Sequence, residues 1–244
     1  MKKCLAAILA ACFFSLLAAE NSERLSGEKF LEAARNPYGR NNWAIMEGEA
    51  THRRKGEPVI VAPIYIGIRF TPERTLAQVI INNDEGYYVG QKYEKSKDAT
   101  SVIPMKKNAQ KSELANFGLR PQDLTMTFMF WDMLKELPSD TVRGRDCRVF
   151  MLESPDKKEK AKVFISSKYF FPLKIEWLKV GQKEKGKAYR TGEFKSFRKE
   201  GNFWLVSSLI IYGPGWKTKV EFEKTRADYS KNSVPKDLFR KLKD

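Results

Sequence analysis

Apolar and polar residues alternate along several segments of this chain, which is the pattern of half-buried β-strands. In residues 59–70 one face of the predicted strand carries only apolar side chains: Ile60, Ala62, Ile64, Ile66, Ile68 and Phe70. In residues 216–226 lysine and glutamate alternate with a second, mostly apolar face: Trp216, Thr218, Val220 and Phe222. Because sheets with one dry and one wet face are typically antiparallel, both segments predict antiparallel strands.

Further strand-like segments lie between clusters of turn-forming residues. They predict strands from Trp43 onward and over residues 76–82, 85–93, 149–153, 161–166, 173–180, 187–197 and 203–212. Gly213-Pro214-Gly215 is typical of the turns between them, because glycine and proline favour tight reversals of the chain. This regular spacing predicts a mainly β fold with a few helices, in which one large antiparallel sheet is strongly curved or closed into a barrel.

Two segments carry helical patterns instead. Residues 26–29 open a short amphipathic helix that Pro37 ends, with serine as the first capping residue. Residues 109–138 form an insertion rich in methionine and aromatic side chains. A helix start at Pro121 and a stop at Pro138 predict that this insertion is helical.

The role of residues 109–138 has two interpretations. The flexible, polarizable methionines adapt to ligands of variable shape, so a helix lying across a concave sheet would be the lid of an adjustable apolar cavity. Alternatively, the same helix is a plug that fills the core. The alternation of Met126, Phe128 and Phe130 also suits a strand at the beginning of this run.

The first nineteen residues have the form of a secretory signal peptide. Two lysines precede an almost wholly apolar run, which is short for a membrane span and ends in two alanines suited to cleavage. We therefore expect residues 1–19 to be removed and residues 20–244 to form a single periplasmic domain. The alternative is a lipid anchor at Cys12, because small residues precede this cysteine as they do in lipoproteins.

Charge narrows the range of partners. The chain has 45 lysine and arginine residues against 30 aspartate and glutamate residues, a net charge of +15. Such an excess suggests nucleic acid or an anionic membrane surface, and export argues against nucleic acid. The lysines are spread along the chain, so one interpretation is that they only cover the solvent-facing sides of strands. Contact with anionic lipid head groups is the other.

Few residues suited to catalysis remain once the leader is removed. His52 is the only histidine, and it lies at a polar strand end, where a surface or strand-end role is expected rather than that of a catalytic base. Cys147 would then be the only cysteine, and its strand position predicts a buried, inert thiol rather than a nucleophile. No glycine-rich phosphate loop is present. We therefore expect no catalytic residues, no metal and no cofactor.

Several motifs of the second half occur in a recognisable order. They are Gly-Arg-Asp-Cys-Arg-Val at 144–149, Phe-Pro-Leu-Lys at 171–174, Lys-Thr-Lys-Val-Glu at 217–221 and Val-Pro-Lys-Asp-Leu-Phe at 234–239. With the export signal and the many strands, this order resembles the outer-membrane lipoprotein-sorting family, the LolA-like proteins, and in particular an uncharacterised branch of it. The resemblance covers roughly residues 43–242.

The resemblance implies a half-open antiparallel β-barrel that encloses helices and holds acyl chains in an apolar cavity. It implies a non-catalytic periplasmic carrier of lipid or lipoprotein, with membrane-protein donors and acceptors as partners. The candidate cavity residues are Ile64, Ile66, Ile68, Phe70, Met126, Phe130, Met133, Trp177, Trp216 and Phe222. A structural or sensory envelope protein with a filled barrel that binds a protein partner is the main alternative. A hydrolase acting through His52 or Cys147 is a third hypothesis.

Overall fold

The computed structural model describes residues 25–36, 39–94, 99–106, 112–181 and 186–242. The predicted signal peptide at residues 1–19 and the predicted lipidation at Cys12 lie outside these residues, and both stay predictions. Among the described residues, no helix combines the length and the apolar character needed to cross a membrane.

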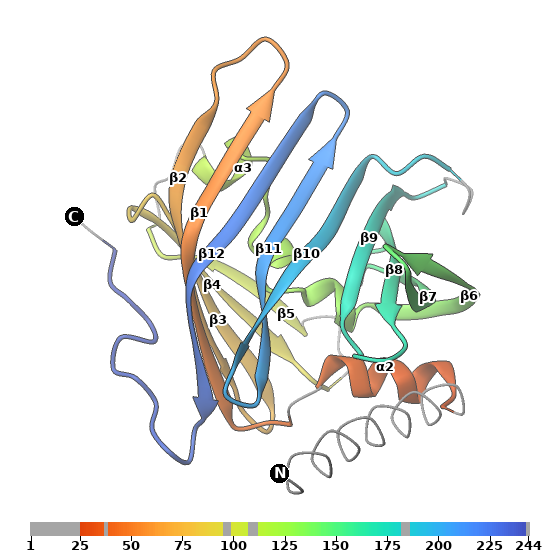
Figure 1. The fold of residues 1–244 in the computed structure, drawn as a ribbon, viewed down its shortest axis with the longest axis horizontal. Coiled ribbons are helices and arrows are strands. Elements are labelled where there is room, and N and C mark those ends of the chain that lie inside the picture. Colours follow the sequence, from red (N-terminus) through yellow and green to blue (C-terminus); the bar gives the residue numbers. More distant parts are fainter. Residues whose placement is uncertain (1–24, 37–38, 95–98, 107–111, 182–185, 243–244) are drawn as a thin grey trace, which may run out of the picture.

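Twelve strands form one antiparallel sheet in the order β5-β4-β3-β2-β1-β12-β11-β10-β9-β8-β7-β6. The strands are β1 (Asn42–Arg54), β2 (Ile60–Phe70), β3 (Arg74–Ile81), β4 (Glu85–Lys92), β5 (Thr100–Pro104), β6 (Asp132–Val142), β7 (Arg145–Glu153), β8 (Glu159–Ser166), β9 (Pro172–Lys179), β10 (Arg190–Glu200), β11 (Phe203–Gly213) and β12 (Trp216–Tyr229). The sheet curves strongly but does not close, because β5 and β6 remain its two edges (Figure 1). The predicted mainly β fold, with a curved, half-open antiparallel sheet, is confirmed.

Short helices occupy the concave side and one end of this sheet (Figure 1). They are α2 (Gly27–Arg35), α3 (Glu113–Asn116), α4 (Pro121–Leu124) and the 3₁₀ helix η1 (Thr127–Phe130). The prediction for α2 is confirmed: the Ser26 hydroxyl accepts a hydrogen bond from the Lys29 amide, which caps the helix. The apolar face of α2 is buried through Phe30, Leu31 and Ala34.

The prediction of a helix across residues 109–138 is wrong for its second part. Within residues 112–138, the part of the segment that the structure describes, the chain is helical only in short turns, and from Asp132 it becomes the edge strand β6, which pairs with β7. The left-handed backbone of Met126, with a φ of 54°, separates α4 from η1. Pro138 lies at an irregularity between Leu137 and Asp140 of β6, where an edge strand tolerates proline because the ladder does not need its missing amide hydrogen.

The sheet carries buried side chains on both faces. A large cluster fills the concave side, and it includes Val220 and Phe222 from the predicted apolar face of β12. A smaller cluster lies on the other face, where Leu238 of the C-terminal segment covers Tyr65 and its neighbours. The Tyr65 hydroxyl donates to the Leu238 carbonyl at 2.9 Å. Gly67 is required here, because a Cβ at this position would collide with the Leu238 carbonyl oxygen.

Candidate functional site

A mostly apolar pocket of about 130 Å³ lies between the concave face of the sheet, the end of α2 and the chain around η1. Its walls come from β1–β4 and from the first residues of β9 and β11. In Figure 1, α2 lies at the lower end of the sheet. Residues 125–131 close it on the side away from the sheet, and we call them the roof segment. The pocket therefore joins segments that lie far apart in the sequence.

The strand register explains why a pocket forms at this place. Ala44, Ile68, Ala77 and Val89 are paired partners on β1, β2, β3 and β4, so they form one row across the pocket floor. Two members of this row are alanines, although their strand neighbours carry larger aliphatic side chains. Since core side chains normally pack to fill the available space, the two short side chains, one on each side of Ile68, leave room above the sheet.

The next row, formed by Asn42, Phe70, Thr75 and Gln91, gives the pocket a polar rim. Its polar groups already have partners within the protein. The Asn42 side-chain amide donates to Gly39 at 2.8 Å, and the Gln91 amide donates to the Lys92 carbonyl at 2.8 Å. The pocket surface is therefore mostly apolar, and the lining cation Arg35 is engaged by backbone carbonyls of the protein.

One cation fastens the roof segment to α2. The Arg35 guanidinium donates to the Met129 carbonyl at 2.7 Å and to the Trp131 carbonyl at 3.1 Å. Its charge also lies 5.7 Å from the centre of the Phe130 ring. Burial lowers the pKa of Arg35, whereas the nearby Asp132 carboxylate opposes this change. The guanidinium remains charged at neutral pH, as arginine does in proteins, and its two hydrogen bonds connect the end of α2 to the roof segment.

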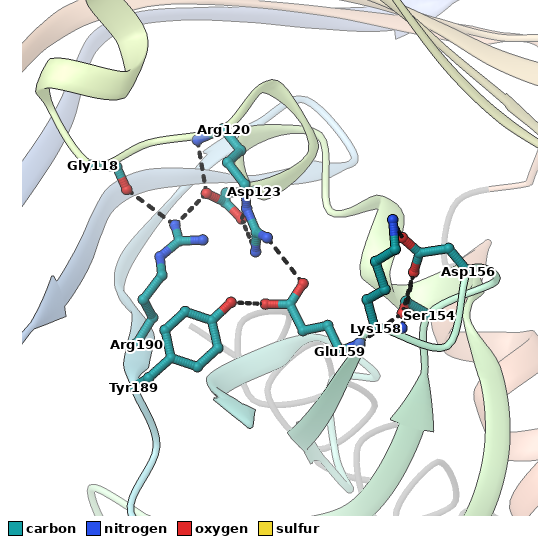
Figure 2. Close-up of polar contacts among 9 residues, drawn as sticks. All are labelled: Gly118, Arg120, Asp123, Ser154, Asp156, Lys158, Glu159, Tyr189 and Arg190. Carbon is teal, nitrogen blue, oxygen red and sulfur yellow. Dashed lines mark hydrogen bonds and ion pairs between the residues drawn. The ribbon is translucent and has the colours of Figure 1, made fainter. Parts of the chain in front are cut away.

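A buried ion pair fixes the chain immediately before the roof segment (Figure 2). Asp123, at the end of the short helix α4, is only 2% exposed. It pairs with Arg190 at the start of β10, which also donates to the Gly118 carbonyl at 3.1 Å. The Arg190 guanidinium lies 4.7 Å from the Trp177 ring centre. These contacts anchor α4 to the sheet.

Arg120 extends this charged cluster toward the surface. It contacts Asp123 through its Nε atom at 3.2 Å and Glu159 of β8 through Nη1 at 2.9 Å (Figure 2). Burial alone would lower the pKa of Arg120, but the two carboxylates hold it above its ordinary value. Tyr189 donates to Glu159, and burial together with that carboxylate raises the pKa of Tyr189 to about 12. The cluster is balanced in charge, which suits an anchor.

Some of the cavity residues that were predicted from the sequence lie together in this pocket. Ile68, Phe70, Met126 and Phe130 line it. The other six nominated residues do not line it: Ile64, Ile66, Trp177 and Phe222 are buried in the surrounding core, and Met133 and Trp216 are half-buried against that core.

Sequence reasoning missed the two floor alanines and Arg35. The signal for Ala44 and Ala77 was a short side chain at an inward position of a strand. That signal has no meaning until the pairing of the strands is known. Arg35 is the last residue of α2, where a basic residue is ordinary, so its contacts to the roof segment could not be read from the helix pattern.

His52 and Cys147 are both buried. For His52 we expected a surface or strand-end role: the strand-end position is confirmed, and the surface position is wrong. It lies near the end of β1, but it is only 2% exposed between the rings of Phe117 and Trp216, with Nδ1 2.7 Å from the Thr218 hydroxyl. The buried thiol predicted at Cys147 is confirmed, and burial raises its pKa to about 11. Among the described residues, no group of three or more His, Cys, Asp or Glu side chains is arranged to hold a metal ion.

Comparisons with known proteins agree on the fold. No protein-family model and no curated protein sequence matches the chain. A putative outer membrane lipoprotein-sorting protein domain from Vibrio parahaemolyticus superposes with a TM-score of 0.64 at 14% identity, over 87% of this chain and 97% of that one. A DUF1329 family protein from Desulfovibrio piger gives a TM-score of 0.63 at 13% identity, over 83% and 91% of the two chains.

A LolA superfamily protein from Nitrosomonas europaea is also similar, with a TM-score of 0.54 at 12% identity over 89% of this chain and 98% of that one. Sequence identities this low establish a shared fold and nothing finer. The resemblance to the LolA-like proteins, inferred from the order of the motifs, is confirmed at the level of the fold: this chain shares its fold with a LolA superfamily protein and with a putative lipoprotein-sorting domain.

Proposed function

We propose that this protein is a non-catalytic periplasmic carrier that binds the acyl chains of a lipid or lipoprotein during outer-membrane lipoprotein sorting. The observation that carries the proposal is the apolar pocket beneath a roof segment that Arg35 holds by two hydrogen bonds. The likeness in fold to a putative lipoprotein-sorting domain supports the same function. A carrier needs neither cofactor nor catalytic group, because burial of hydrocarbon supplies the binding free energy.

The size of the pocket indicates how binding would proceed. A buried methylene contributes about 0.8 kcal/mol, so an acyl chain gains affinity with every carbon that enters. The pocket, partly open and with a volume of about 130 Å³, is similar in volume to apolar protein cavities that accept a molecule the size of benzene. It therefore admits only a short piece of an acyl chain, and a full chain requires the roof segment to move away from the sheet.

The contacts around the roof segment define what would move. The Asp123–Arg190 pair holds the chain on one side, and β6 begins at Asp132 on the other. Between them, the two Arg35 hydrogen bonds come from a charged donor, and each such bond contributes about 1.5–3 kcal/mol. The burial of about four to eight methylenes offsets their loss. Cargo therefore opens the roof, and its release allows Arg35 to close it again.

The proposed carrier works in the periplasm, after removal of residues 1–19. Membrane proteins that deliver and accept the cargo would be its partners. If lipid is instead attached at Cys12, the same pocket would belong to a membrane-anchored acceptor. The mass of the protein purified from envelopes distinguishes cleavage after Ala19 from lipidation at Cys12.

The test is native mass spectrometry of the protein purified gently from envelopes, together with titration by a fluorescent fatty acid. Met126→Glu places a carboxylate in the pocket and is expected to abolish the bound-lipid mass and to weaken fatty-acid binding at least tenfold. Leu134→Glu is the matched control, because Leu134 is 45% exposed and does not line the pocket. An empty protein without affinity for fatty acid would overturn the proposal, as would equal binding by both variants.

One observation favours a second function. Phe128 and Met129 are buried in the concave core, so part of the 109–138 insertion fills the half-open barrel rather than covering a large cavity. A structural or sensory envelope protein would have such a filled core and would bind a protein partner on its outer surface. An empty pocket in the experiment above, with a protein recovered in stable association, would favour this alternative.

A further inference from the structure

The hairpin between β1 and β2 projects beyond the rest of the sheet at the end far from α2 (Figure 1). Residues 53–61 are all exposed, which makes nine consecutive exposed positions across the hairpin tip. On one side β2 extends beyond β3, because the pairing of these two strands ends at Ile64. The tip therefore touches little of the body of the protein, and its composition is not explained by folding.

Three consecutive β-branched side chains lie on this exposed tip. Val59 is 50% exposed, Ile60 is 38% exposed and Val61 is 55% exposed. Alternate residues of a strand point to opposite faces, so both faces of the tip present apolar groups. An exposed apolar strand end is a liability for aggregation, and proteins ordinarily use polar residues there. These three exposed side chains increase the risk of aggregation, and such a feature is expected where the residues form a contact site.

Basic side chains surround the apolar triplet. Arg53, Arg54 and Lys55 precede it, and the only carboxylate between positions 53 and 61 is Glu57, which pairs with Arg54 at 3.4 Å. The adjacent strand adds the exposed Lys217, which is the register partner of Arg53. The hairpin tip therefore combines exposed apolar side chains with a surrounding group of cations, Arg53, Arg54, Lys55 and Lys217.

We propose that the hairpin tip, residues 53–61, is an attachment point for an anionic lipid surface. Apolar side chains that enter the boundary between head groups and acyl chains, flanked by lysine and arginine that meet anionic head groups, are the elements of peripheral membrane binding. A protein partner would also cover apolar residues. The cations that surround this narrow tip, with a single carboxylate among them, match a negatively charged lipid surface better than they match a protein partner.

This attachment point is separate from the pocket. Arg54 lies ten positions after the floor residue Ala44 on β1, a distance of about 33 Å along an extended strand. A protein attached through the tip would hold its pocket and α2 away from the bilayer. The proposal therefore stands or falls independently of acyl-chain binding in the pocket.

The test is flotation of the full protein, expressed with its own leader, with lipid vesicles. Vesicles with about one-third phosphatidylglycerol should carry the protein to the top of the gradient, and pure phosphatidylcholine vesicles should not. Each basic residue at an anionic surface contributes about a fivefold gain in partition, so Arg53→Gln with Lys55→Gln should lower binding roughly 25-fold. Val59→Ser with Val61→Ser should lower it by at least tenfold. Salt at 0.5 M should release the protein by screening.

Two control variants test whether the loss of vesicle binding is specific to the hairpin tip, or whether removing any exposed charge or apolar side chain has the same effect. Lys158→Gln removes a cation whose side chain is 83% exposed in another turn. Ile103→Ser removes an apolar side chain that is 58% exposed on the edge strand β5. Both control variants should bind as the unmodified protein does. Thermal melts should show all variants folded, because the substituted side chains are exposed.

Three results would overturn the proposal: no binding to anionic vesicles, equal binding to both vesicle types, or binding that neither hairpin variant weakens. A photoreactive amino acid at position 59 in intact envelopes gives an independent answer. Adducts with phospholipid support the proposal. Adducts with one defined protein, and none with lipid, would assign the tip to a protein partner instead.

Discussion

Replacing Ala77 with leucine tests whether the pocket is open space. Ala77 lies on β3 in the middle of the pocket floor, paired with Ile68 on one side and Val89 on the other, and it is 2% exposed. A leucine at this position adds three carbons that point from the sheet toward the roof segment. In a filled core such an addition is destabilising, whereas above a cavity it completes the packing.

The magnitude follows from the volume. A sealed cavity costs about 24 cal/mol per Å³, so about 3 kcal/mol is the upper limit on the stability that filling this partly open pocket of about 130 Å³ can add. Three buried carbons recover at most about 2.4 kcal/mol, and ordering a leucine side chain costs about 0.5–1 kcal/mol. We expect Ala77→Leu to raise the free energy of unfolding by about 1.5 kcal/mol, which raises Tm by about 3–6 °C in a domain of this size.

The assay is calorimetry and urea unfolding of Ala77→Leu beside a matched control, Ala161→Leu. Ala161 is also buried in the concave core, but it sits between Leu152 and Trp177 and does not line the pocket. The control should lose about 1–3 kcal/mol through overpacking. If Ala77→Leu is destabilised to the same extent, the space does not exist and the reasoning is refuted. The stabilised variant should also lose affinity for fatty acid.

Three further predictions concern buried polar groups. Burial lowers the pKa of His52 below 6.5, so the unfolded chain takes up a proton on this side chain more readily than the folded protein does. The free energy of unfolding should therefore be highest above about pH 6.5 and fall in more acidic solution. In urea titrations, His52→Gln should lack the part of this pH-dependent fall that His52 causes. Asp123→Asn leaves Arg190 buried without its carboxylate and should cost about 3–5 kcal/mol in calorimetry; a cost under 1 kcal/mol would refute the anchoring role. The Cys147 thiol, with a pKa raised to about 11, should resist disulfide reagents at pH 8 until guanidinium unfolds the protein, and rapid labelling of the folded state would contradict its burial.

Local patterns in the sequence determined most of the architecture. The alternation in residues 60–70 and 216–226 predicts strands whose inward residues are buried, since neighbouring positions on a strand face opposite sides. Ser26 predicts the start of α2 because capping depends on residues only three apart. These features rest on short-range geometry, so they can be read before the fold is known.

The second half of the 109–138 insertion shows where local patterns fail. Its apolar side chains suit a helix and a strand equally, and long-range pairing with β7 decides the outcome for β6 from Asp132 onward. The residues around His52 indicated a polar strand end, yet the rings of Phe117 and Trp216, which belong to distant segments, pack against His52 and enclose it. In both cases the deciding neighbour is remote in the sequence.

The pocket belongs to the same class of features. The sequence by itself determined a mainly β fold with a curved antiparallel sheet and an apolar concave face, whereas the export leader that it predicts lies outside the described residues. Only the tertiary structure aligned Ala44 beside Ile68 and Ala77 across separate strands, and only it brought Arg35 to the roof segment. A cavity is the volume that side chains from many elements leave unfilled, so it depends on register and packing rather than on the pattern of any single element.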